Sequence, residues 1–298
     1  MSTDRGPGSS DAVRASASWS PSAREVERSH ARKAMARRNA RIAAASSIVV
    51  IGSLLAIVVM SPGWPVLVET FFNIDYGREV LGTVAKGLLT NLWLTTVAAI
   101  VIGAFGLVLA LARTSTSASL TPFRFLATVY VDVFRGVPLL LVILLVGFGV
   151  PALRLHGLTK SVLVLGTTAV ILTYSAYVAE VLRSGILSVH PSQRAAARSL
   201  GLSSRQTLRY VVLPQAIKRV IPPLLNDLVA LMKDSGLVSI LGVIDAVRAA
   251  QIESSSTFNY TPYVTAAALF LLITVPLTRY TDRVLLRSIQ RQNAQGTA

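Results

Sequence analysis

Long, uncharged stretches of apolar residues recur along the chain, and short polar segments separate them. A helix that crosses a bilayer needs about 20 mainly apolar residues. Stretches that approach or exceed this length cover residues 42–60, 88–112, 136–153, 161–179 and 254–278; residues 123–134 extend the third, and the last is apolar mainly over 263–277. A weaker stretch at 215–232 contains Lys218, Arg219 and Asp227 besides Pro222 and Pro223. The pattern therefore predicts an all-α membrane protein with about six transmembrane helices.

The first stretch is predicted to remain in the protein as a membrane anchor. The apolar region of a signal peptide has about 7–15 residues and lies near the N-terminus, whereas this stretch has 19 residues and starts at Ile42. Residues 1–41 before it are polar and rich in arginine, so we expect a basic cytoplasmic tail that is disordered or lies along anionic membrane lipid. A further apolar segment at 237–244 is too short to cross the membrane and predicts a re-entrant or interfacial helix.

The content and distribution of charged residues support the predicted membrane architecture and indicate its orientation. Charged residues make up only 14% of the 298 residues, whereas soluble domains have about 25%. The net charge of +15 is compatible with a nucleic-acid partner, but 22 of the 29 Lys and Arg residues fall on one predicted side of the membrane and 6 on the other. Cytoplasmic segments carry such an excess. Topology therefore explains the charge without nucleic acid, and it predicts that both termini are cytoplasmic.

Motifs for catalysis or for metal and nucleotide binding are missing from the sequence. The chain has no cysteine, no G-x-x-x-x-G-K-S/T phosphate loop and no H-E-x-x-H, and its three histidines lack a metal-ligand spacing. Lys233 and Ser235 could be read as a Ser–Lys dyad, but two residues this close in sequence fit a polar turn before Gly236 better. We therefore expect no enzyme activity, and no cofactor or metal on this chain.

The basic segment between the fourth and fifth predicted spans is the most informative part of the chain. Residues 192–200 are rich in alanine and predict a short helix. Gly201 supplies a position where a left-handed backbone costs little, and Ser203 is a suitable N-cap for a second short helix. Pro214 is expected to end that helix before the chain re-enters the membrane. The product is a helical elbow suited to docking a partner.

The elbow resembles the EAA loop of the permease subunits of ATP-binding-cassette (ABC) importers, a pattern of E-A-A, three residues, Gly, nine residues and I-x-L-P. Aligned on Gly201, the matching residues are Ala196, Ala197, Gly201, Val211, Leu213 and Pro214, whereas Ala195 replaces the Glu and Ser192 replaces the usual preceding Gly. Residues 130–140, 174–185 and 213–235 are similar to the polar-amino-acid subgroup (histidine/glutamine type) of these permeases. The candidate ATPase-coupling residues are then Gln193, Ala195, Ala196, Ala197, Gly201, Leu213 and Pro214.

The resemblance implies an architecture, a set of partners and a transported solute. Residues 83–290 would form a five-helix permease domain in the cytoplasmic membrane, with a cytoplasmic coupling helix, after an extra helix at 42–60 and an extracytoplasmic loop at 61–82, and before a tail at 291–298. Two ABC ATPases using ATP, a second permease subunit of the same or a homologous kind, and an extracytoplasmic solute-binding protein would complete an importer for a polar amino acid such as glutamine or glutamate. An ion-coupled secondary transporter and an intramembrane enzyme remain the alternatives.

Polar residues inside the predicted spans are candidates for the translocation path. Thr173, Tyr177, Glu180 and Ser184 are four, three and four residues apart and share one helical face. Asn226 and Asp227 follow the Pro222-Pro223 pair, where a kink is expected, and broken helices often mark transport sites. A satisfied patch between helices is the alternative for the first set. Pairing of Glu180 with Arg183 and of Asp132 with Arg135 fits mutual neutralisation, and Asn91 and Thr95 fit helix packing.

Overall fold

The computed structural model describes residues 22–115 and 117–296, and the regular elements of this part are all helical, as predicted. The chain divides into one compact unit up to Val66 and a second from Leu67 onward. The first unit is dominated by α1 (Ala23–Val59). Residues 23–41, predicted as a disordered tail, are therefore helical, because Ala, Arg, Glu and Lys in this segment are good helix formers. Residues 1–21 of that tail lie outside the described residues.

Two other segments predicted as loop or tail are also helical. The loop predicted at 61–82 contains α2 (Trp64–Phe71) and the start of α3 (Ile74–Thr114), whose N-cap is Asn73. The Asn73 side chain accepts a hydrogen bond from the Tyr76 backbone at 3.0 Å, which satisfies one of the free amides of the first turn. At the other end, α12 (Thr261–Gly296) continues through most of the tail predicted at 291–298.

The third predicted span is a bent pair of helical segments. In order they are η1 (Ala118–Leu120), α4 (Thr121–Gly136), α5 (Leu139–Leu144), the π-helical η2 (Leu145–Gly149) and α6 (Val150–Ala152). The chain turns by 106° between Gly136 and Leu139. Pro138 is the physical cause, since a residue before proline is driven out of the helical region, and Val137 has φ −97° and ψ 131°.

The remaining helices complete the second unit. They are α7 (Val162–Leu187), α8 (Pro191–Ser199), α9 (Ser204–Thr207), the π-helical η3 (Leu208–Val212), α10 (Leu213–Asp234), the 3₁₀ segment η4 (Ser235–Leu241), α11 (Ala246–Thr257) and α12. By length and apolar composition, four described helical segments could cross a membrane, or five if the bent pair counts as one span. The charged, proline-containing α10 is not among them, so the count of six remains a prediction.

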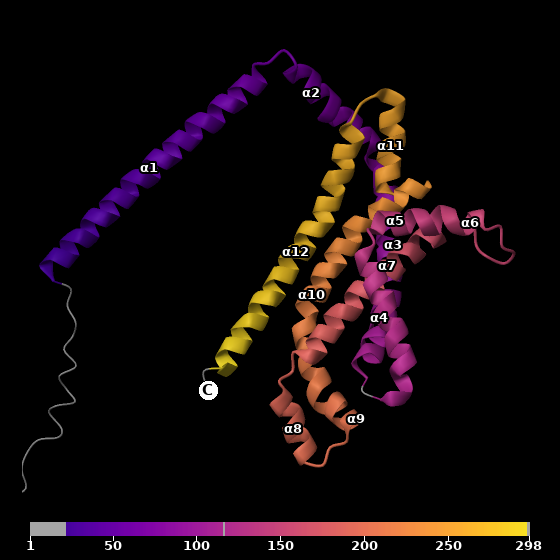
Figure 1. Ribbon diagram of the computed structural model, residues 1–298. Helices are drawn as coiled ribbons and strands as arrows, with labels where there is room; N and C mark the ends of the chain where they lie inside the picture. Colours follow the sequence, from indigo (N-terminus) through magenta and orange to yellow (C-terminus); the bar gives the residue numbers. More distant parts are fainter. Residues whose placement is uncertain (1–21, 116, 297–298) are drawn as a thin grey trace, which may run out of the picture. The chain divides into compact units, whose positions relative to one another are not determined.

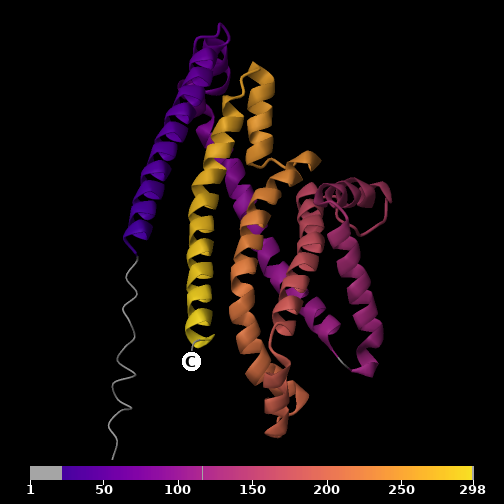
Figure 2. The ribbon, with the colours of Figure 1, turned by 60° about the vertical axis from the view of Figure 1, so that its left-hand side comes forward.

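The core of the second unit is centred on α3 and α7, which form its largest interface. Gly106 permits this approach: a Cβ at that position would lie 2.8 Å from Cγ1 of Val178 on α7. The central cluster also includes Leu94, Ile143 and Val238, from α3, α5 and η4. Figures 1 and 2 show α8 and α9 at one end of this unit, the end toward which α12 also finishes, and α11 at the opposite end.

Candidate coupling elbow and translocation path

The elbow begins at α8, which is capped at both ends. Nδ1 of His190, the N-cap residue, accepts the Ser192 backbone N–H at 3.2 Å, and Pro191 occupies the first turn, where a missing N–H costs nothing. At the C-terminal end, Gly201 has φ +84°. Its N–H donates to the carbonyl of Arg198 at 3.0 Å, and the N–H of Leu202 donates to that of Ala197 at 3.2 Å. This pair of bonds is a Schellman cap, and the predicted left-handed glycine is confirmed.

The second arm of the elbow follows the predicted cap but not the predicted stop. The Ser203 side chain accepts the Gln206 N–H at 3.3 Å, and the Gln206 side chain accepts the Ser203 N–H at 2.8 Å, so Ser203 is the N-cap of α9 within a full capping box. The expectation that Pro214 ends the helix is wrong. The π-helical η3 leads directly into α10, and Pro214 lies in the first turn of α10, where proline is tolerated.

Side chains fasten the elbow to the two long helices on either side of it. Arg194 on α8 donates to the carbonyl of Ile186, and Arg219 on α10 donates to the carbonyl of Ser188 and, at 3.0 Å, to its Oγ. The last carbonyls of α7 are thereby satisfied by arginines, as is common at helix C-termini. Gln215 on α10 also donates to the side chain of Gln193 on α8. The end of α7, the elbow and the start of α10 are consequently one bonded assembly.

The candidate coupling residues divide into an anchored set and an outward-facing set. Ala197 is buried, whereas Ala195 and Ala196 are exposed, and Leu200 at the tip of the elbow is 83% exposed. Leu213 packs beside a small buried cluster that includes Ile186 and Val212. Because alanine has only a methyl side chain, Ala195 and Ala196 form an exposed patch on α8 that another protein can approach closely.

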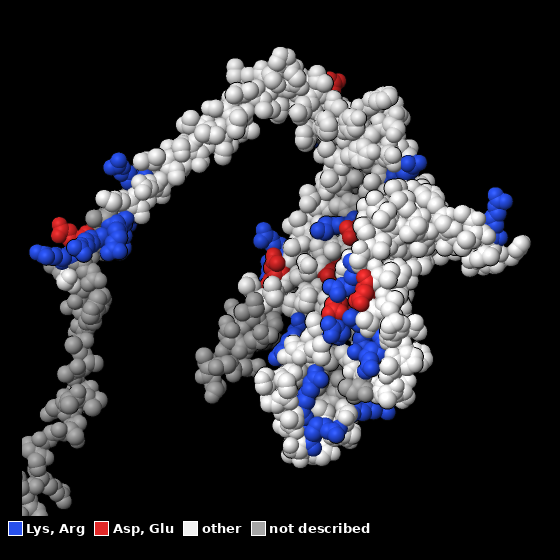
Figure 3. Space-filling view, viewed as in Figure 1, with Lys and Arg blue, Asp and Glu red and all other residues white. Residues whose placement is uncertain are grey.

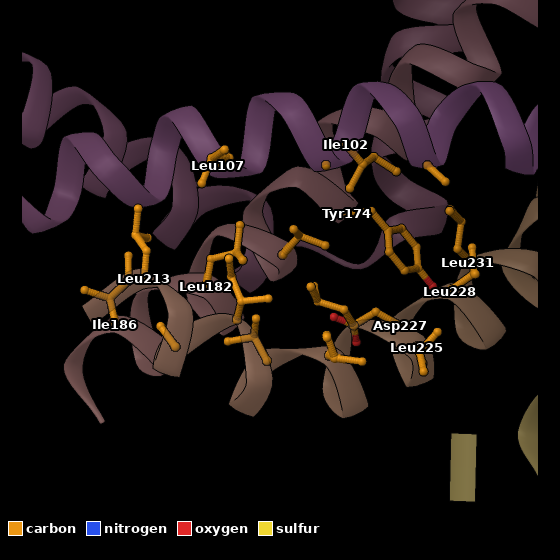
Figure 4. A pocket seen from close by; sticks show the side chains of 18 residues that line it. Ile102, Leu107, Tyr174, Leu182, Ile186, Leu213, Leu225, Asp227, Leu228 and Leu231 are labelled. Carbon is orange, nitrogen blue, oxygen red and sulfur yellow. The ribbon is translucent and has the colours of Figure 1, made fainter. Parts of the chain in front are cut away.

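A cavity of about 550 Å³ lies between α3, α7 and α10. Figure 4 shows Asp227 extending from α10 toward this hollow, in which the labelled neighbours are otherwise mainly leucine and isoleucine. Within the described part of the chain, the buried Oδ2 of Asp227 has no hydrogen-bond partner. Tyr174 also lines the cavity, and its hydroxyl donates to Oδ2 of Asp234 at 2.7 Å. The cavity is thus apolar, and one carboxylate with an unpartnered oxygen borders it.

The predicted path residues are not gathered at this cavity. Asp227 lines it, but its neighbour Asn226 is exposed and does not. On α7 the lining residues are Tyr174, Val178, Leu182 and Ile186, which lie on a face next to the predicted one. In the predicted set, Thr173 is fully buried, Tyr177 is 37% exposed, Glu180 forms ion pairs, and Ser184 donates to the carbonyl of Val181 at 2.8 Å. Sequence reasoning thus missed Tyr174, although it lies inside a segment quoted for its family resemblance.

Glu180 joins charges from three helices. Its carboxylate lies 2.6 Å from Nη1 of Arg113 on α3, 2.7 Å from Nη2 of Arg183 on α7 and 3.8 Å from Nη1 of Arg135 on α4. The predicted pairing with Arg183 is confirmed. Arg135, however, forms its ion pair with Glu180 rather than with Asp132, because α4 packs against α7 and brings the Arg135 side chain within reach of Glu180.

The chain matches the model of a protein family described as the binding-protein-dependent transport system inner membrane component, over residues 115–288. It belongs to this family. Members are transporter permease subunits rather than enzymes, they work with a separate ATPase and a binding protein, and they are multi-pass membrane proteins. The matched region contains the elbow and the whole of α7 and α10, the two long helices that the elbow joins.

Relatives and a solved structure agree with this membership. This permease is 32% identical to the arginine transport system permease protein ArtQ of Bacillus subtilis over 209 residues, or 69% of the chain and 93% of the relative. It is 39% identical to the probable glutamine ABC transporter permease protein GlnM of Bacillus subtilis over 160 residues, or 53% of the chain and 72% of the relative. The crystal structure of an amino acid ABC transporter with histidines matches with a TM-score of 0.64 at 33% identity. The match covers 73% of this chain and 98% of the chain in that structure.

A buried polar node on the side of the permease away from the elbow was also missed in part by sequence reasoning. Asn91 of α3 donates to Oγ of Ser235 and to Oδ2 of Asp245, both at 3.0 Å, and its own Oδ1 accepts the Ala246 N–H at 3.1 Å. The three side chains are at most 1% exposed. Packing was the expected role of Asn91, and this is confirmed; its partners lie more than 140 positions away, where local patterns give no signal.

Proposed function

We propose that this permease is one transmembrane subunit of an ABC importer that moves a polar amino acid, such as glutamine or glutamate, into the cell. The observation that carries the proposal is the elbow, which is built as a two-helix projection around Gly201 and belongs to a chain of this family. Its exposed surface around Ala195 and Ala196 is the docking face for the ATPase. Its bonds to α7 and α10 carry the force of nucleotide-driven closure toward the cavity.

The cavity between α3, α7 and α10 is the proposed translocation path. Asp227 is the solute-facing charge, because an unpaired carboxylate with apolar neighbours gains most from a cationic partner. An amino acid supplies such a partner in its α-ammonium group. Thr173, Tyr177, Glu180, Ser184 and Asn226 do not line this cavity in the single chain, and a path role for them requires a surface completed by the second permease subunit.

A second permease subunit, the same or homologous, is expected to cover the apolar side of this cavity. One chain supplies the walls from three helices, and the lining is almost wholly aliphatic apart from Tyr174 and Asp227. An aliphatic wall is well suited to packing against another helix bundle. ArtQ and GlnM, named above, are permeases described for arginine and glutamine, and this favours an amino acid as solute.

Charge and shape together support an orientation with the elbow in the cytoplasm. The segment 183–219, which contains the elbow, has seven Lys and Arg residues. Figures 1 and 2 place the end of α12 toward the same end of the second unit, so the proposal that the C-terminus is cytoplasmic is consistent with the fold. The extracytoplasmic face then contains α11 and the loop with His156, where the solute-binding protein docks.

The direct test is solute uptake by proteoliposomes that contain the permease with its ATPase and binding protein. We expect ATP-dependent uptake of radiolabelled glutamine, glutamate or arginine, and no uptake of maltose. Uptake by the permease alone, driven by a proton or sodium gradient without ATP, would instead support a secondary transporter. Uptake of maltose with none of the amino acids would reject the solute class.

Coupling through the elbow is tested with Gly201→Asp. A side chain in the left-handed region costs roughly 1 kcal/mol or more, and the acidic group also intrudes at the docking face. We expect normal insertion, no uptake, and ATP hydrolysis that is absent or no longer stimulated by the loaded binding protein. Gly157→Asp is the control for backbone strain in the insertion and unfolding measurements, because Gly157 also has a positive φ, +87°, and a Cβ added there would meet nothing within 4 Å. Wild-type uptake and stimulation in Gly201→Asp would show that this elbow does not couple.

A further inference from the structure

A second cavity, of about 380 Å³, lies where α3 ends, α4 begins and α7 passes. Its lining is unusually basic: Arg113 of α3, Arg124 of α4 and Arg183 of α7 are joined by Thr121, Phe125 and Thr128. In the proposed orientation this is the cytoplasmic side, since the cavity adjoins the loop between α3 and α4. Figure 3 shows basic side chains gathered toward this end of the second unit, around α4, α8 and α9.

The carboxylates nearby do not neutralise these arginines. Among the described residues, Arg113, Arg135 and Arg183 share one carboxylate in their ion pairs, that of Glu180. Arg124 donates to the carbonyl of Ser115 at 3.0 Å and to Oγ1 of Thr121 at 3.4 Å, both of them neutral groups. Asp132 adds an electrostatic interaction with Arg183. Four arginines against two carboxylates leave an excess of two positive charges in this group. Arg124 is the arginine for which the described part of the chain supplies no acidic partner.

The surface beside the cavity is apolar and exposed. Phe123, Phe125 and Leu126 on α4 are 63%, 66% and 62% exposed, and Leu120 just before α4 is 42% exposed. Phe125 belongs both to this surface and to the lining of the basic cavity. Basic groups next to exposed aromatic and aliphatic side chains match a ligand with an anionic head and hydrocarbon tails.

We propose that this cavity binds the phosphate of an anionic phospholipid from the cytoplasmic leaflet. Arginine guanidinium groups bind phosphate through charge-assisted hydrogen bonds, and basic pockets between membrane helices on the cytoplasmic side bind anionic headgroups. The acyl chains lie along Phe123, Phe125 and Leu126. Because Arg124 belongs to α4 and the other two lining arginines to α3 and α7, the bound phosphate ties α4 to the α3–α7 pair.

The test is native mass spectrometry of the full chain in detergent, titrated with phosphatidylglycerol or with phosphatidylcholine. We expect tighter binding of phosphatidylglycerol, and Arg124→Gln should weaken it about fivefold, the contribution of one basic residue near an anionic headgroup. Thr128→Leu keeps every charge but fills the cavity, and it should weaken the same binding. Arg124→Lys should retain most of it, and Arg279→Gln, an exposed arginine on α12, should leave it unchanged.

The outcomes separate the proposed site from its alternatives. Equal binding of both lipids, or equal loss in Arg124→Gln and Arg279→Gln, would overturn the proposal, as would displacement of phosphatidylglycerol by inorganic phosphate, which would identify a site for a soluble anion. If Arg124→Gln lowers thermal stability by the same amount in nanodiscs of either lipid, Arg124 has a merely structural role, and that result would also overturn the proposal. The inference rests on the proposed orientation and not on the solute, so a failure of amino-acid uptake leaves lipid binding intact.

Discussion

Replacement of Asn91 by leucine is expected to destabilise the permease far more than its volume change suggests. Leucine has nearly the same size but cannot donate to Oδ2 of Asp245 or accept the Ala246 N–H. These two buried groups would lose the partner that Asn91 provides, whereas Ser235 keeps its bond to the carbonyl of Met232 at 2.7 Å. An orphaned buried polar group costs about 1–3 kcal/mol, so the two together should cost roughly 3 kcal/mol after local relaxation.

The assay is thermal unfolding of the purified chain in detergent, with near-normal membrane insertion as a precondition. A loss of roughly 3 kcal/mol corresponds to a fall in Tm of about 6–12 °C for a domain of this size. Thr95→Val is the matched control, because Thr95 lies one turn further along α3 and its hydroxyl makes only a 3.5 Å contact with the sulfur of Met232. A fall in Tm no larger than that of Thr95→Val would refute the view that the Asn91 node joins α3 to η4 and α11.

Three further results are expected. Gly106→Ala should cost about 1–3 kcal/mol of stability through overpacking against α7, whereas Gly82→Ala, an exposed helical position with open space around its Cβ, should stabilise by up to about 1 kcal/mol in the same unfolding assay. Asp227→Asn should raise the KM for amino-acid uptake about tenfold, by the loss of one charge-assisted contact of about 1.5 kcal/mol, with the exposed Asp282→Asn as its control; an unchanged KM would remove Asp227 from the path. Because the chain has no cysteine, His156→Cys should react with an impermeant maleimide from outside intact cells, and labelling only after lysis would reverse the proposed orientation.

Local sequence signals predicted the parts of the molecule that local physics determines. Gly201 and Ser203 were identified because a left-handed turn and an N-cap each depend on one residue type, and both are found where expected. The alternation of apolar and charged stretches likewise indicated a helical membrane protein. Pro214 was misread because a proline is compatible both with the end of a helix and with the first turn of the next, and only the following helix distinguishes the two.

Features that depend on distant contacts were not predictable from pattern. The path-lining face of α7 was predicted from its polarity, yet the face that lines the cavity is the neighbouring one, which is opposite residues of α3 and α10 across the cavity. Helix α11 has an ordinary polar sequence, yet Asp245 at its N-cap accepts a hydrogen bond from Asn91, which lies 154 positions earlier in the sequence. The predicted span at 136–153 looked apolar enough to cross, but Pro138 turns it away from α4.

The fastening of the elbow by Arg194 and Arg219 restricts how the transport cavity can change shape. The end of α7 and the start of α10 are bonded through the same short segment, and Gly106 locks α3 onto α7 at close range. In the proposed importer, the three walls of the cavity would therefore move as one rigid unit at the end that contains the elbow. If a second permease subunit completes the path as proposed, alternating access would come from the two subunits rotating against each other, and the gate would lie at the interface between them.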